Sequence, residues 1–311
     1  MIYTITLNPS IDYVIHINQL HLGELNKMEN EMKFPGGKGI NVSRLLHELK
    51  YDTTALGFLG GFTGDFIVGE LNNKGIRAKF TPIHGETRIN IKLKSETETE
   101  INGLGPEILP HEADHLLCQL GDLTRQDMII LSGSTPPSLN NDYLQQLIEQ
   151  IASSGASFVT DTTGNALKSV LPYRPLLVKP NMEELGGLFG VTLSSLNEVV
   201  YYGKKLLDLG TQYAIVSMAG DGALLFTEEG IYQGSTPAGH VKNSVGAGDS
   251  MIAAFAGKWK ETGDVMEAFR MGLASGSATA FSDDLAKAED IYPLLNKIDI
   301  TRIEGKKKHE D

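Results

Sequence analysis

The amino-acid sequence predicts an α/β fold, a doubly wound and mostly parallel sheet with a smaller sheet beside it. Two observations support this. Short runs of β-branched and apolar residues alternate with helical stretches, the order expected of βαβ units. Two other segments, 12–33 and 88–101, alternate apolar and polar residues, which is typical of a sheet with one solvated face. The 311 residues are compatible with one α/β domain, so we expect a single domain spanning 1–311.

The elements of the main domain are read from these patterns in chain order. Buried strands are expected at Ile2–Leu7, Ala55–Leu59, Met128–Leu131, Ser157–Thr160, Leu176–Val178 and Tyr213–Ser217. The helices between them are expected at Gly39–Leu49, Asp65–Lys74, Tyr143–Ser154 and Leu196–Leu209. Ser195 and Glu198 have the spacing of a capping box, which favours a helix start there.

The C-terminal third adds a hairpin, Ala223–Phe226 with Gly230–Gln233, and two closing helices, Gly246–Thr262 and Asp264–Phe281. The short charged tail, 305–311, is expected to be disordered and solvated.

The two alternating segments are expected to form a separate small sheet, a lid inserted into the main domain. In the second segment Ile89, Ile91 and Leu93 alternate with Asn90, Lys92 and Lys94. Successive side chains of a strand point to opposite faces, so one face is apolar and the other polar.

Composition narrows the classes of function. A net charge of −12 would repel a phosphate polymer on average, so we expect no nucleic-acid partner. No apolar run is long enough to span a bilayer, so we expect no membrane partner. The single cysteine, Cys118, rules out internal disulfides and cysteine-based metal clusters, and favours a cytoplasmic setting. A small anionic substrate would need a local basic pocket.

The segment Asn243–Ser250 places a Gly-Ala-Gly-Asp turn before a helical stretch. Small residues allow a phosphate to approach the backbone, where amides and the helix dipole favour negative charge. We expect the dipole to keep Asp249 ionised, ready to accept a proton from a hydroxyl that attacks phosphorus. The alternative is a glycine-rich helix start with an acidic dipole partner. The turn is neither a P-loop nor a complete dinucleotide fingerprint.

A second glycine-rich turn, Phe34–Ser43, also precedes a helix. Lys38 could meet an anionic ligand there, and Asn41 lies on the first helical turn. The alternative is a surface lysine in a flexible turn. Two such turns in one chain favour two anion sites, and a kinase needs one for the nucleotide and one for the acceptor.

These two turns resemble the two signatures of the ribokinase-like (PfkB) carbohydrate kinases. The resemblance runs from Thr6 to about Thr301. The stretches Glu100–Pro106 and Lys179–Leu185 are similar to family members that phosphorylate ketohexose phosphates. The resemblance implies ATP-dependent phosphorylation of a ketohexose phosphate, with fructose 1-phosphate converted to fructose 1,6-bisphosphate as the leading reaction.

The resemblance also assigns roles to residues of this sequence. It makes Asp249 the catalytic base and gives an anion hole to Gly246, Ala247 and Gly248. The acceptor would be bound by Asp12, Gly37, Lys38, Asn41, Arg88, Asn90 and Asn102, with Arg88 as the candidate for the acceptor phosphate. The nucleotide would be bound by Lys179, Asn181, Ser217, Ala219, Gly220, Gly222 and Gly248. Glu184 would hold Mg²⁺ through water. The resemblance also implies a monovalent cation such as K⁺ as a further cofactor, bound near the loop before Gly246.

Each assignment has a structural alternative. Asp12 could cap a turn, Arg88 could be a solvated strand residue, and Asn102 could be a turn residue. Asn181 and Glu184 could form only a helix cap.

Tagatose 6-phosphate and fructose 6-phosphate are alternative acceptors, and a nucleoside kinase is less favoured because Lys38 and Arg88 suit a phosphorylated sugar. A different class is a catalytically silent sugar-phosphate or nucleotide sensor. The resemblance also implies a homodimer formed through the lid.

Overall fold

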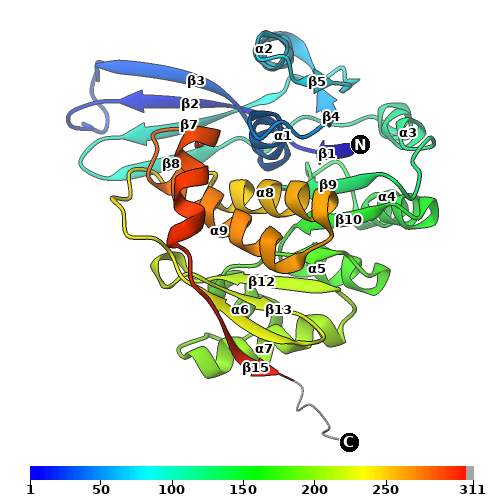
Figure 1. Cartoon of the computed structure of the whole chain (residues 1–311). Helices are drawn as coiled ribbons and strands as arrows, with labels where there is room; N and C mark the ends of the chain where they lie inside the picture. The colour runs from blue at the N-terminus through cyan, green and yellow to red at the C-terminus, as the bar shows by residue number, and fades with distance from the viewer. Residues whose placement is uncertain (306–311) are drawn as a thin grey trace, which may run out of the picture.

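The computed structural model describes residues 1–305, in which one large sheet carries helices on both faces (Figure 1). The sheet order is β15-β14-β13-β12-β11-β10-β9-β1-β4-β5, with β6 also paired to β4. The parallel strands are β1 (Ile2–Thr6), β4 (Thr53–Leu59), β5 (Arg77–Ala78), β6 (Thr81–Pro82), β9 (Met128–Ser132), β10 (Ser157–Asp161), β11 (Leu177–Val178) and β12 (Tyr213–Ser217). Strands β13 (Ala223–Phe226), β14 (Gly230–Gly234) and β15 (Ile300–Gly305) continue the sheet antiparallel. The predicted doubly wound, mostly parallel sheet is confirmed.

The helices divide between the two faces of this sheet. One face packs against α3 (Pro110–Gln119), α4 (Asn141–Ser154), α5 (Gly164–Val170), α6 (Met182–Phe189) and α7 (Leu196–Asp208). The other packs against α1 (Lys38–Glu48), α8 (Ala247–Thr262), α9 (Val265–Ala280) and α10 (Ala288–Ile291). Helix α2 (Gly61–Asn73) packs near the small sheet. Because both faces are covered, every residue of β9 is buried.

Local sequence signals place several helix ends. Ser195 accepts a hydrogen bond from the Glu198 amide, and the Glu198 side chain accepts one from the Ser195 amide, so the predicted capping box is confirmed. Asp264 caps α9 by accepting from two amides of its first turn.

The sequence patterns did not single out α3, α5, α10, β5, β6 or β15, most of which are short. Gly305, expected in the disordered tail, ends strand β15 beside β14 instead. The rest of that tail, 306–311, lies outside the described residues.

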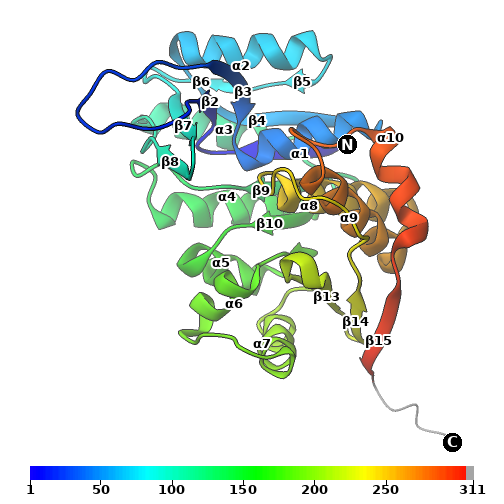
Figure 2. The same cartoon turned by 90° about the vertical axis from the view of Figure 1, so that its left-hand side faces the viewer.

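The small sheet is separate from the main one and has the order β3-β2-β7-β8. Its strands are β2 (Ser10–His16), β3 (Asn30–Gly36), β7 (Arg88–Lys94) and β8 (Glu98–Asn102). It projects to one side of the main body in Figure 1, and that side faces the viewer in Figure 2. The separate small sheet predicted from the alternating segments is therefore confirmed. Ser10, Asp12 and His16 pair with Arg88, Asn90 and Lys94, so the polar residues of β2 and β7 share a face.

Among residues 1–305, no helix combines the length and the apolar character that a membrane crossing requires.

Candidate active site

Two adjoining cavities contain every site residue named from the sequence. The polar cavity, about 670 Å³, lies between the small sheet and the carboxyl ends of the main strands. It is lined by Asp12, Gly37, Lys38, Asn41, Arg88, Asn90, Asn102, Lys179, Asn181, Glu184, Ser217, Gly246, Gly248 and Asp249. The second cavity, about 820 Å³, is lined by Ala219, Gly220, Gly222 and Ala247, and shares Asn181, Ser217 and Gly248 with the first. Ligands of open α/β sheets bind at this edge.

The Gly-Ala-Gly turn lies where the two cavities meet. Gly246 precedes α8 with a φ of 80°, and a Cβ there would lie 2.7 Å from the Leu285 side chain. A Cβ on Gly248 would lie 3.0 Å from the Lys179 ammonium nitrogen. The missing side chains therefore let a lysine approach the amino end of α8, where the backbone amides also attract anions.

Asp249, on the first turn of α8, is buried with 6 % of its surface exposed. Its carboxylate accepts a 2.9 Å hydrogen bond from the Asn41 amide nitrogen. Burial, then the charge of Asp161, raises the pKa of Asp249 to about 6, against the lowering effects of Asn41, Lys38 and Lys179. A carboxyl with this pKa is mostly ionised at pH 7 and can accept a proton.

Asp249 is thus still mostly ionised at pH 7, as expected, but its pKa is raised, whereas a helix dipole acting alone would lower it. The dipole argument holds for a solvated acid at a helix start, whereas burial and a second carboxylate dominate at this position. The base is tuned toward neutral pH, the range in which general bases are effective.

Asp161 is the functional candidate that the sequence reasoning missed. It ends β10, is 3 % exposed, and lies 3.0 Å from the Lys38 nitrogen and 3.8 Å from the Lys179 nitrogen. Burial alone would raise the pKa of Asp161, but the two lysines outweigh it and hold that pKa below its usual value. Its position directly after a predicted buried strand was the available signal, because carboxyl ends of parallel strands converge on ligand sites.

The Gly-Gly-Lys-Gly turn is closely packed. A Cβ on Gly36 would lie 2.4 Å from the Asp12 carboxyl carbon. Gly37 has a φ of 107°, and a Cβ there would lie 2.8 Å from the Thr6 side chain. Lys38 pairs with a buried aspartate, so it is not merely a surface lysine in a flexible turn.

The polar face of the small sheet contributes Asp12, Asn90 and Asn102 to the first cavity. Asp12 accepts hydrogen bonds from the Ser10 hydroxyl at 2.8 Å and from the Asn90 amide at 3.1 Å. Asn90 is itself buried and accepts from the Gly103 amide at 3.2 Å. Asn102 lies opposite Asn90 in β8 and is exposed. These contacts orient the Asp12 carboxylate toward the cavity.

Arg88 lines the same cavity, but its guanidinium is bound to backbone. Nε and Nη2 donate to the Asn8 carbonyl at 3.2 and 3.0 Å, and Nη1 donates to the Gly103 carbonyl at 2.8 Å. It is therefore not a solvated strand residue. Three of its five donors are used, which leaves two for a ligand.

Asn181 and Glu184 form the capping box of α6. The Glu184 amide donates to the Asn181 side chain at 2.8 Å, and the Asn181 amide donates to Glu184 Oε2 at 2.9 Å. The structural alternative for this pair is thus realised, although both residues also line the polar cavity.

The second cavity has largely apolar walls. Besides the predicted loop it is lined by Met251, Leu273, Ala280 and Phe281, which the sequence analysis did not single out. A Cβ on Gly222 would lie 2.0 Å from the Gly234 carbonyl oxygen, so the loop tolerates no side chain there. An apolar cavity beside a helix N-terminus suits a nucleotide, because the apolar walls can hold the nucleobase and the helix amides can bind the phosphates.

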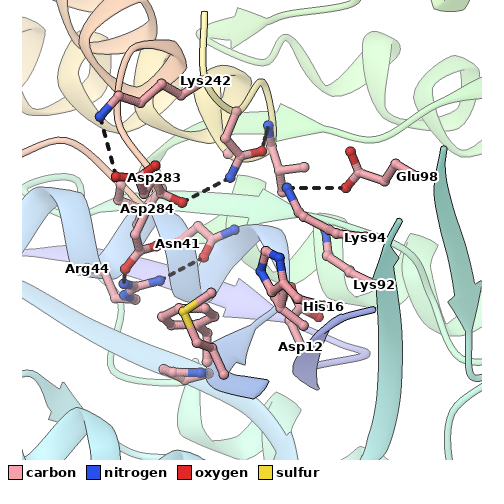
Figure 3. A pocket seen from close by; sticks show the side chains of 18 residues that line it. Asp12, His16, Asn41, Arg44, Lys92, Lys94, Glu98, Lys242, Asp283 and Asp284 are labelled. Carbon is pink, nitrogen blue, oxygen red and sulfur yellow. Dashed lines mark hydrogen bonds and ion pairs between the residues drawn. The ribbon is translucent and has the colours of Figure 1, made fainter. Parts of the chain in front are cut away.

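A third, smaller cavity of about 140 Å³ lies between the small sheet and the loops that flank α8 and α9 (Figure 3). Lys92, Lys94 and His16 line it from the small sheet. Asp283 and Asp284 line it from the segment after α9. It adjoins the polar cavity at Asp12 and Asn41.

Comparison with known proteins agrees with this geometry. Residues 5–289 match the pfkB family of carbohydrate kinases. The chain is 46 % identical to the 1-phosphofructokinase of Bacillus subtilis, over 97 % of this chain and 100 % of the relative. It is 35 % identical to the D-tagatose-1-phosphate kinase of Bacillus licheniformis, over 97 % of this chain and 100 % of the relative.

Solved structures are similar over the same span. Phosphofructokinase-2 from Escherichia coli in complex with fructose-6-phosphate has a TM-score of 0.90 and 28 % identity, over 95 % of this chain and 98 % of that chain. The same enzyme has been solved with potassium and as a tetrameric inhibited form. A ribokinase from Arabidopsis thaliana shares the fold, with a TM-score of 0.77 and 20 % identity, over 94 % of this chain and 98 % of that chain. The chain belongs to the pfkB family of carbohydrate kinases.

Proposed function

We propose that this chain transfers the γ-phosphoryl group of ATP to the C6 hydroxyl of fructose 1-phosphate, with Asp249 as the general base. The observation that carries the proposal is the buried Asp249 carboxylate, which lines the polar cavity directly after Gly248, a residue that lines both cavities. The polar cavity suits a sugar phosphate and the apolar cavity suits a nucleotide. The similarity to a 1-phosphofructokinase supports the choice of acceptor.

In this mechanism the acceptor hydroxyl donates its proton to Asp249 as its oxygen bonds to the γ-phosphorus, and ADP leaves. Asp12 and Asn90 orient the sugar from the small sheet. The amides of Gly246 and Gly248, with Lys179 beside Gly248, would stabilise the negative charge of the transferring group, whereas the Ala247 amide already donates to the Ser244 carbonyl at 3.3 Å. Lys38 adds a second cation nearby. Phosphoryl transfer depends mainly on such positioning and charge stabilisation.

The carboxylates of the polar cavity are suited to bind Mg²⁺ through water molecules. Glu184 and Asp161 line the polar cavity, while residues 1–305 contain no group of three or more His, Cys, Asp or Glu side chains placed to hold a metal. Mg²⁺ commonly keeps several waters and is held by one or two carboxylates and substrate phosphates. The ion would neutralise phosphate charge, and Glu184 would bind it through water. A K⁺ requirement stays a prediction.

An ADP-release assay tests the catalytic role. Asp249→Asn should lower kcat by about 10² to 10⁴-fold, because loss of a general base typically has that effect. A variant that turns over within a few-fold of the wild type would contradict the assignment. A wild-type chain that releases no ADP with any acceptor would instead support a silent sensor.

A second candidate acceptor is a tagatose phosphate, which the relative from Bacillus licheniformis supports. Values of kcat/KM for fructose 1-phosphate, fructose 6-phosphate, tagatose 1-phosphate and tagatose 6-phosphate, measured side by side, decide between them. Fructose 1-phosphate should be preferred by tenfold or more.

The small sheet would act as a lid and as a dimer interface. Its outer face exposes Ile89 and Ile101, and the loop between β2 and β3 exposes Leu22 and Leu25, the latter at 88 %. Contiguous exposed apolar surface commonly marks an interaction site. A homodimer formed through this face would cover it. A cytoplasmic location also stays a prediction from the cysteine content.

A further inference from the structure

Arg44 is a buried charge to which the mechanism above gives no role. It lies on α1, one turn after Asn41, and is only 9 % exposed. Its Nη2 forms an ion pair with Asp284, and its Nη1 lies 3.5 Å from the Asn41 side-chain oxygen (Figure 3). A buried guanidinium needs such partners to offset the loss of water, and one of the two, Asn41, belongs to the active site.

Asn41 lies between two opposite charges. Its amide nitrogen donates to Asp249, and its oxygen faces Arg44. The flipped amide would turn its N–H groups toward the guanidinium and its oxygen toward the carboxylate, and both contacts would be repulsive. The charge of Arg44 and its long hydrogen bond therefore both favour the Asn41 orientation in which the amide nitrogen donates to Asp249.

The segment that holds Asp284 is tied to the same helix as the base. The Ala286 amide donates to the Thr279 hydroxyl at 3.2 Å, and that hydroxyl donates to Ser250 at 2.8 Å. Ser250 follows Asp249 in α8. Asp284, Arg44, Asn41 and Asp249 thus form a continuous chain of contacts from the segment after α9 to the first turn of α8.

We infer that Arg44, held by Asp284, is a positioning residue for phosphoryl transfer, because it orients the Asn41 amide toward the Asp249 carboxylate. The inference rests on the proposed role of Asp249 as base. Removing the guanidinium releases the Asn41 amide, so the carboxylate loses a hydrogen bond that favours its ionised form.

The other charges that face Asp249 come from separate elements. Asp161 lies on β10, Lys179 follows β11, and Lys38 starts α1. Arg44 makes no hydrogen bond or ion pair to any of them within residues 1–305. Loss of the Arg44 charge also acts on Asp249 directly through space, so the charge-conserving Arg44→Lys isolates the part of a titration change that passes through Asn41.

The test compares Arg44→Met, Arg44→Lys and Asp284→Asn with the wild type in steady-state assays from pH 5 to 8.5. Lys242→Met is the matched control, because Lys242 lines the same small cavity but pairs with Asp283 at 3.4 Å. We expect Arg44→Met to lower kcat roughly tenfold at pH 7, with both KM values within about twofold. The acid limb of its kcat profile should move upward by about one pH unit. Arg44→Lys should restore part of both effects, and Lys242→Met should match the wild type.

The inference is overturned if Arg44→Met keeps the wild-type kcat and acid limb, or if it raises only the acceptor KM. Should Arg44→Met fail to fold, Asp284→Asn decides, since Asp284 is partly exposed and the change keeps its shape. An acid limb that moves upward in Asp284→Asn supports the inference, and an unmoved limb overturns it. Asp249→Asn, run alongside, separates the two claims: if it stays active, the assignment of the base fails, whereas an inactive Asp249→Asn beside a normal Arg44→Met removes only the positioning role.

Discussion

Replacing Asp249 by asparagine should make this protein more stable at neutral pH while it lowers kcat by about 10² to 10⁴-fold. Burial raises the pKa of this carboxyl from an ordinary value of 3.8 to about 6. Each pH unit of that difference corresponds to about 1.4 kcal/mol, so the ionised side chain destabilises the folded state by about 3 kcal/mol. The uncharged asparagine keeps the shape and can still accept the hydrogen bond from Asn41.

The direction in which the stability difference changes with pH depends on whether the folded or the unfolded chain loses the Asp249 proton at lower pH. Below pH 3.8 the carboxyl is protonated in the folded and unfolded chains, and its stabilising contribution is fully present. As the pH rises toward 6, the unfolded chain ionises while the folded chain stays protonated, and this contribution is lost. The stability gap between the variant and the wild type should therefore grow from near zero around pH 4 to about 3 kcal/mol at pH 8.

Urea unfolding followed by circular dichroism at pH 4.5 and pH 8 measures the gap. Asp161→Asn is the opposing control, because two lysines hold the pKa of Asp161 below its usual value. That variant should be less stable than the wild type at pH 8, and its deficit should shrink as the pH falls through the pKa of folded Asp161. An Asp249→Asn variant no more stable than the wild type at pH 8, or equally more stable at both pH values, would refute the reasoning.

Three further predictions concern the site and the assembly. Gly248→Ala should lower kcat roughly tenfold, because the new Cβ would meet Lys179 at 3.0 Å. The control, Gly69→Ala, has open space around it, so it should keep full activity and raise the free energy of unfolding in denaturant by about 0.5–1 kcal/mol. Arg88→Ala should raise the KM of the acceptor far more than that of ATP in initial-rate assays, and equal increases would argue against a role at the acceptor phosphate. Ile101→Glu, at a side chain 57 % exposed on the small sheet, should convert a dimer to monomers in light scattering, whereas an unchanged mass would place the interface elsewhere.

The sequence alone predicted the architecture and most of the polar residues that line the site, although not Asp161. Alternation of buried strands with helices predicts the parallel sheet, and period-two alternation predicts the small sheet, because both periods follow from local backbone geometry. The two glycine-rich turns likewise identified Lys38 and Asp249. Such signals lie within a few neighbouring residues, so they can be read without knowing the contacts between distant segments.

Only the tertiary structure decided how these residues act. Asn41 meets Asp249 across 208 positions of sequence, and Asp161 reaches Lys38 across 123. Burial and the charge of Asp161 raise the pKa of the base, while Asn41 and Lys38 lower it, and the net effect is a pKa above the value that the helix start alone would suggest. Arg88 uses most of its donors on the backbone of Asn8 and Gly103, which no local pattern shows. Ionisation depends on the solvent removed and the charges brought near, and both are properties of the packed chain rather than of any segment of its sequence.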